Sequence, residues 1–192
     1  GKSKNSIDSY TVSVYADKST ESGYIEGSLT YGINDNTSTR VINTASLDRA
    51  YSANYDSQQI SLKVGGGIPQ EVTDSAFVTP FMSVTGTNIT TDAYTEKSNV
   101  ANDALRLSVA QDDINSVVGS VGVKAHMVTN AGTPMISLAL NNEFGDSKIN
   151  SNNNYTGGGT KFKTSTEVEE VSATLGLGYS FGNDVTSLNI NY

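Results

Sequence analysis

The sequence contains few residues able to perform covalent chemistry. It has a single histidine, His126, and no cysteine among its 192 residues. A Ser-His-Asp triad would need His126 as its base, but His126 follows Ser120, Gly122 and Lys124 at every second position. Such spacing places side chains on one face of a β-strand, here a face of small and polar residues. We therefore interpret His126 as a polar wall residue and predict no catalytic residue and no enzyme.

The sequence also predicts no metal ion and no cofactor. A zinc site needs three or four ligands, and without cysteine it would depend almost wholly on carboxylates. The stretch Asp112-Asp113-Ile114-Asn115 lacks the ligand spacing and the glycine of a calcium loop. Gly65-Gly66-Gly67 and Gly157-Gly158-Gly159 lack the lysine and the strand–helix setting of a phosphate-binding loop. We interpret all three stretches as turns.

Charged residues within the predicted strands are the remaining functional candidates. Most of them share a strand face with serine, threonine and glycine rather than with large apolar residues. A water-filled barrel interior would hold such charges, whereas a charge facing lipid at the membrane midplane costs roughly 2–4 kcal/mol. Charges in a pore wall tune ion preference, and a merely hydrated wall is the alternative. The lumen-lining candidates are Glu26, Lys63, Arg106, Lys124, His126 and Glu143.

The stretch 170–192 shows most clearly that these polar faces belong to β-strands. Leu175 and Leu177 alternate with Gly176 and Gly178, and a Gly-Asn-Asp turn separates this run from a second alternating run. Alternation with a period of two on either side of such a turn predicts a β-hairpin. A soluble core needs large residues pointing inward, whereas a membrane barrel turns them outward to lipid and keeps small polar residues inside. The pattern favours the barrel.

The same alternation recurs along the chain and predicts nine strands. Most are about 8–12 residues long, closer to the 9–11 residues of a membrane strand than to the 5–6 residues of an average soluble one. Single-chain bacterial barrels have even strand numbers, with short turns at one end and long loops at the other. Nine is odd, so either a strand is hidden in a loop or the chain covers part of a barrel. The expected strands are 9–16, 25–33, 59–64, 76–87, 105–110, 117–127, 136–141, 172–181 and 187–192.

Three polar stretches, 34–56, 88–103 and 146–170, are expected to be loops, with a further short strand near 40–45 as an alternative in the first. In the nine-strand count these loops do not all fall at the same end of the barrel. Eighteen glycines, ten tyrosines and only three prolines suit a β-rich chain. The net charge of −8 makes nucleic acid an unsuitable partner. No apolar run reaches the roughly 20 residues of a membrane helix, so only strands could span a membrane.

Six short motifs occur in a fixed order between residues 55 and 181. In this order and spacing they resemble the C-terminal translocator β-domain of autotransporters (type V secretion), in particular that of rickettsial surface-cell-antigen proteins. Asn142 stands where that family often has histidine. The motifs are Tyr55-Asp56-Ser57, Thr79-Pro80-Phe81, Tyr94-Thr95-Glu96, Val121-Gly122-Val123, Asn142-Glu143-Phe144-Gly145-Asp146 after Pro134, and Leu175-Gly176-Leu177-Gly178-Tyr179-Ser180-Phe181.

The resemblance implies an all-β protein, an antiparallel transmembrane barrel of a 12-stranded family, in the bacterial outer membrane. Through its lumen a passenger domain of the same polypeptide, a surface antigen or adhesin, would reach the cell surface. Implied partners are outer-membrane lipid, the passenger and the barrel-assembly machinery. Residues 1–192 would then be a single, incomplete domain that lacks the first strands, the plug helix and the final strand.

Two other kinds of function remain open at this point. One is a stand-alone outer-membrane porin or adhesin barrel. The other is a soluble β-sandwich that binds carbohydrate, which would place Leu175 and Leu177 in a dry centre and the neighbouring glycines at the surface. The direction in which the large side chains point therefore separates the membrane proteins from the soluble one.

Overall fold

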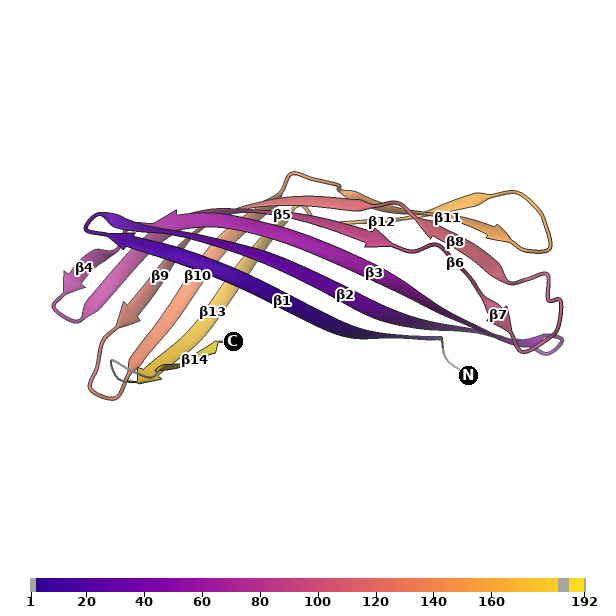
Figure 1. Cartoon of the computed structure of the whole chain (residues 1–192), viewed down its shortest axis with the longest axis horizontal. Coiled ribbons are helices and arrows are strands. Elements are labelled where there is room, and N and C mark those ends of the chain that lie inside the picture. Colours follow the sequence, from indigo (N-terminus) through magenta and orange to yellow (C-terminus); the bar gives the residue numbers. More distant parts are fainter. Residues whose placement is uncertain (1–2, 183–186, 192) are drawn as a thin grey trace.

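The computed structural model describes residues 3–182 and 187–191, and every strand pair in it is antiparallel. A ten-stranded sheet, which we call the main sheet, curls along the length of the molecule (Figure 1). No helix in the described part of the chain is long and apolar enough to cross a membrane. In hydrogen-bonded order the main sheet contains β1 (Lys4–Thr20), β2 (Gly23–Asn43), β3 (Asp48–Gly67), β5 (Ala76–Thr91), β9 (Ile114–Met127), β10 (Thr133–Glu143), β13 (Val171–Gly182) and β14 (Ser187–Asn191), with β4 (Gln70–Thr73) added to β5 and β7 (Lys97–Ser98) added to β3.

A second, four-stranded sheet lies at one end of the molecule, beside the outer part of the β2–β3 hairpin (Figure 1). We call it the loop sheet, because its strands belong to the connections that leave β5 and β10. Its order is β12 (Phe162–Glu167), β11 (Lys148–Tyr155), β8 (Leu107–Gln111) and β6 (Tyr94–Thr95).

The placement of β8 corrects the expected strand count. The sequence prediction put a strand over 105–110 in the barrel wall, but β8 pairs with β6 and β11 in the loop sheet. The hydrogen-bonded path of the described main sheet then runs through eight strands, an even number. The two long connections, 92–113 and 144–170, now leave the same end of this sheet. We call it the long-connection end; the β2–β3 hairpin projects there as well.

The polar stretch 34–56 is regular, contrary to the expectation of a loop. β2 and β3 stay paired from Tyr24 and Gly67 to Asn43 and Asp48 at the hairpin tip. They contain 21 and 20 residues, about twice the 9–11 residues that cross a membrane. The outer halves of these strands are mostly polar, so the alternation of apolar and polar residues that marks a half-buried strand is weak there, although buried and exposed positions still alternate. The strand suspected near 40–45 is the end of β2.

The two other expected loops also contain strands: β6 and β7 occur within 88–103, and β11 and β12 within 146–170. The short strand β4 was not expected. The other wall strands match the predictions, and all except 187–192 have extended ends, because backbone pairing continues beyond the region of apolar alternation. The predicted strand 187–192 corresponds to β14 (Ser187–Asn191); Tyr192 and the predicted turn residues Asn183 and Asp184 lie outside the described residues.

The large apolar residues of the main sheet are exposed on one face. Leu138 and Leu175 lie directly opposite each other in β10 and β13 and are 51% and 63% exposed. Leu29 and Leu62 form a similar pair between β2 and β3. Gly176 and Gly178, on the other face, are less exposed than the leucines beside them. A soluble β-sandwich would show the reverse arrangement.

Candidate functional site

One face of the main sheet collects small and polar residues, and we call it the inner face. A continuous row of opposed residues crosses it from Glu26 through Gly65, Ser83 and Ser120 to Asn141. Inner-face side chains are partly enclosed; Ser83, for example, is only 9% exposed. The concave side of a curled sheet brings its side chains together, so the inner face is the concave one. It forms a wall that water can wet.

Two of the predicted lumen residues form an ion pair on this wall. Lys63 Nζ of β3 lies 2.8 Å from Glu26 Oε1 of β2. Their side chains are 41% and 35% exposed, so both remain in contact with solvent. The pair therefore neutralises two charges within the wall while leaving them hydrated.

Lys124 and His126 follow on β9, nearer the end with short connections. Lys124 Nζ lies 5.9 Å from the centre of the Tyr24 ring, within the range of a cation–π contact. The His126 ring stacks on Phe77, with ring centres 5.1 Å apart and planes inclined by 13°. Both are aromatic contacts on the inner face, and the stacking gives His126 a packing role.

Glycines allow aromatic rings to lie against the inner wall. A Cβ atom at Gly122 would come within 2.7 Å of Phe81 Cζ. A Cβ atom at Gly67 would come within 2.8 Å of Tyr24 Cε1. The rings occupy the space that a larger side chain at these two positions would fill. Glycine at these positions therefore allows the aromatic rings to lie against the wall.

Glu143 is bound to the backbone rather than directed freely into the lumen. Its carboxylate accepts hydrogen bonds from the Val117 and Gly145 N–H groups, both at 2.7 Å, and from the Ser116 hydroxyl. Three residues further on, Asp146 Oδ2 accepts the Asn115 N–H at 2.7 Å. The motif 142–146 thereby joins the end of β10 to the start of β9.

Arg106 is separated from the other five candidates. It lies outside the main sheet, one residue before β8, and its Nε donates to the Asp103 carbonyl oxygen at 3.1 Å. The main sheet places Glu26, Lys63, Lys124, His126 and Glu143 on its inner face.

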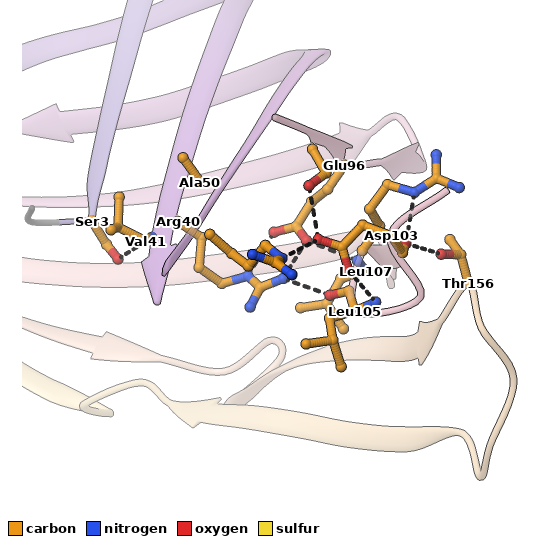
Figure 2. A network of polar contacts seen from close by, with 12 residues as sticks. Ser3, Arg40, Val41, Ala50, Glu96, Asp103, Leu105, Leu107 and Thr156 are labelled. Atoms are coloured by element: carbon orange, nitrogen blue, oxygen red, sulfur yellow. Dashed lines mark hydrogen bonds and ion pairs between the residues drawn. The ribbon is translucent and has the colours of Figure 1, made fainter. Parts of the chain in front are cut away.

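A second group of charges, which the sequence analysis did not identify, lies on the inner face at the long-connection end (Figure 2). We call it the Arg40 cluster; its members are Arg40, Arg49, Tyr51, Glu96 and Asp103. Arg40 Nε donates to Glu96 Oε1 at 2.8 Å, and the guanidinium stacks 4.1 Å from the centre of the Tyr51 ring. Arg49 Nε lies 3.4 Å from Asp103 Oδ2. Glu96, Asp103 and Tyr51 are only 7%, 8% and 1% exposed.

The hydrogen bonds around Asp103 affect its ionisation. The Leu105 N–H donates to Oδ1 at 3.0 Å, and the Ser98 hydroxyl donates to Oδ2 at 2.8 Å. These donors and the Arg49 guanidinium favour the charged form and outweigh burial, so the pKa of Asp103 lies below its ordinary value of 3.8. Asp103 is therefore a carboxylate at neutral pH.

A family model for the autotransporter β-domain matches residues 1–192, the whole chain. The chain belongs to the autotransporter β-domain family. A search of curated proteins gives no match.

Membership in this family settles how the autotransporter β-domain sits in the cell. It is a translocator barrel of the bacterial outer membrane. Barrels of this kind have short periplasmic turns and longer extracellular loops. The long-connection end, with the loop sheet and the Arg40 cluster, therefore faces the cell exterior. Among the described residues, no group of three or more His, Asp or Glu side chains is arranged to hold a metal ion.

Proposed function

We propose that this barrel carries or anchors an N-terminal passenger of the same polypeptide, a surface antigen or adhesin, across the outer membrane. The observation that supports the proposal is the inner face. It bears small polar side chains from β2 to β13 and offers a hydrated path along which an extended chain could move without strong binding. Its work is mechanical and electrostatic, with no catalytic residue, no cofactor and no nucleic acid partner.

The free edges of the sheet support a proposal about closure. In the described residues β1 and β14 are the outermost strands of the hydrogen-bonded path, and β1 is paired along one edge only. An open edge cannot lie in hydrocarbon, because each unpaired backbone group there costs several kcal/mol. We infer that residues 1–192 are a single domain belonging to a 12-stranded barrel in which the edges of this sheet are paired. Its insertion would use the barrel-assembly machinery.

Within this barrel, Glu26, Lys63, Lys124 and His126 would line the lumen and contact a chain passing through it. Glu143 would belong to the wall as a structural carboxylate. Arg106, which lies in the extracellular connection, would act at the mouth rather than inside the lumen.

The test is surface display by the full-length protein in a Gram-negative host. An epitope placed in the passenger should become accessible to antibody and to added protease on intact cells. A matched variant, Leu138→Lys, places a charge on the lipid face and should reduce display together with barrel assembly. An epitope that stays in the periplasm while the barrel itself assembles, as judged by heat-modifiable gel migration, would contradict the proposal.

A stand-alone porin is the second candidate, because the same hydrated inner face would conduct small ions. Porin activity predicts steady conductance and no surface-displayed passenger. The display experiment thus separates the two functions.

A further inference from the structure

The Arg40 cluster lies where the extracellular connection leaves the barrel wall. β5 pairs with β3 as far as Thr91 and Ser57. The chain then departs from the wall at residues 93–96, where β6 begins the loop sheet, and rejoins β3 as β7, with Ser98 opposite Tyr51. Residues 93–96 therefore bulge out of the main sheet, and β6 within them pairs with β8 in the loop sheet.

The connection then folds over the inner face of the wall. Arg40 lies directly opposite Tyr51 in the β2–β3 ladder, so both side chains are on that face. From the connection, the Leu105 carbonyl oxygen accepts a hydrogen bond from Arg40 Nη2 at 2.9 Å, and Glu96 Oε2 accepts the Leu107 N–H at 2.8 Å. Asp103 reaches Arg49 of β3. The residues that join β7 to β8 are thus held against the inside of the wall at its outer end (Figure 2).

Polar contacts dominate this attachment. In the described residues the buried apolar core consists of Tyr51 and Ala53, both on β3 at this end. Regions with few buried apolar contacts open at a lower free energy than packed cores. The carboxylates of Glu96 and Asp103 are buried and stable there because each faces an arginine. Removing one partner leaves a buried charge uncompensated, which favours separation of the two surfaces.

We propose that residues 94–111, together with β11 and β12, form a lid over the extracellular mouth of the barrel. Its latch consists of the Arg40–Glu96 and Arg49–Asp103 ion pairs and the short β7–β3 pairing. Its hinge follows Asp92, whose N–H still donates to the Asp56 carbonyl oxygen of β3 at 2.9 Å. The lid covers the inner face when both pairs are formed and uncovers it when they separate. This proposal needs only a closed barrel and does not depend on the passenger.

A single-cysteine reporter tests the lid, because the chain contains no native cysteine. Ala53 lies on the covered inner face and is 5% exposed, so Ala53→Cys in the full-length barrel should react slowly with a membrane-impermeant maleimide on intact cells. Ser52→Cys, the next residue on the opposite face, is exposed and reports general access. In the Ala53→Cys background, Glu96→Gln or Arg40→Gln should raise the labelling rate by about tenfold. Combining both should add little, because the pair acts as a unit.

Lys97→Gln is the matched control, since Lys97 adjoins Glu96 but is exposed. Its labelling rate at position 53 should equal that of the parent. If Glu96→Gln does not assemble, Asp103→Asn, which weakens the other ion pair, decides the question. The inference is overturned if position 53 labels at the parental rate in assembled latch variants, or if Lys97→Gln accelerates labelling as much as they do. Single-barrel conductance in lipid bilayers gives a second readout and should rise in the latch variants alone.

Discussion

Lys63 and Glu26 neutralise each other across two neighbouring strands of the inner face, with 2.8 Å between the ammonium nitrogen and the carboxylate oxygen. This pairing gives two of the lumen charges an interdependent effect, because removing either residue exposes the charge of the other. Lys124, in contrast, faces an aromatic ring and keeps its positive charge available to the lumen.

The first prediction concerns ion preference. Lys63→Gln leaves the Glu26 carboxylate unpaired in the lumen, so the barrel should become more selective for cations, whereas Glu26→Gln should shift it toward anions. Reversal potentials of bilayer-inserted barrels under a salt gradient measure both shifts. Stability should change by only about 0–1 kcal/mol, because the pair is partly exposed. Lys161→Gln, on an exposed extracellular residue, is the control. Shifts of the same sign from both variants would contradict a role for this pair.

The second prediction tests which face meets lipid. Leu138→Lys should destabilise the barrel by roughly 2–4 kcal/mol, the cost of a lysine at the lipid face near the midplane. The adjacent Ser137→Lys places the same charge on the inner face and should cost much less, because water reaches it. Urea unfolding of the full barrel in lipid vesicles, followed by tyrosine fluorescence, compares the two variants. Equal losses, or a larger loss for Ser137→Lys, would show that the faces have been assigned the wrong way round.

The alternation of residue types was sufficient to predict most of the wall strands and their faces, but not the faces of 76–87, where apolar residues occur at both parities. Leu175 and Leu177 were expected on the outer side of the barrel, and both are exposed on the convex face. Glu26, Lys63 and Lys124 were expected to share the other face, and the register of the sheet brings them onto it. Their contribution to lumen function stays a prediction.

Alternation failed where apolar residues are too few to mark one face of a strand. The outer halves of β2 and β3 are mostly polar and were mistaken for a loop, although their backbones pair to the hairpin tip and Tyr51 and Ala53 are buried there. The opposite error occurred at 105–110, where alternation was present but the strand belongs to the loop sheet. Sequence periodicity identifies a strand but not the strands with which it pairs, so it could not assign β8 to a sheet.

The Arg40 cluster was missed for a related reason. Arg40 and Glu96 are 56 residues apart, and their pairing depends on the β2–β3 register and on the bulge after β5. Glu96 lies within one of the family motifs, Tyr94-Thr95-Glu96. This motif was the only sequence signal near the cluster. Arg106, in contrast, was expected in the wall because it falls within the apolar alternation 105–110, which the structure places at the loop sheet.

The third prediction concerns the turn motif that ends β10. Glu143→Ala removes the acceptor for two backbone N–H groups and should destabilise the barrel by about 1–3 kcal/mol. Gly145→Ala should be at least as harmful, because its Cβ would clash with the Asn115 carbonyl oxygen. Gly158→Ala, whose added Cβ meets no neighbouring atom, measures the cost of strain in a positive-φ loop alone. Heat-modifiable migration against temperature gives the order of stability, and a Glu143→Ala barrel as stable as the parent would contradict a structural role.

The fourth prediction concerns the pH dependence of the lid. Because the pKa of Asp103 is lowered in the folded protein, its carboxylate stabilises the closed lid above its ordinary value of 3.8, and this contribution is lost as the pH falls through the lower, folded value. Arg49, Tyr51 and the Arg40–Glu96 pair surround Asp103, so its protonation leaves Arg49 without an anionic partner.

Conductance of the parent barrel in lipid bilayers should therefore be constant between about pH 7 and pH 5 and should rise only below the ordinary carboxylate range. Asp103→Asn cannot carry this charge, so its conductance should already be raised at neutral pH and should approach that of the parent in acid. A parental conductance that rises between pH 7 and pH 5 would assign the transition to another group, because Asp103 stays ionised throughout that interval. Identical conductance of the parent and Asp103→Asn at neutral pH would show that the Arg49–Asp103 pair does not hold the lid.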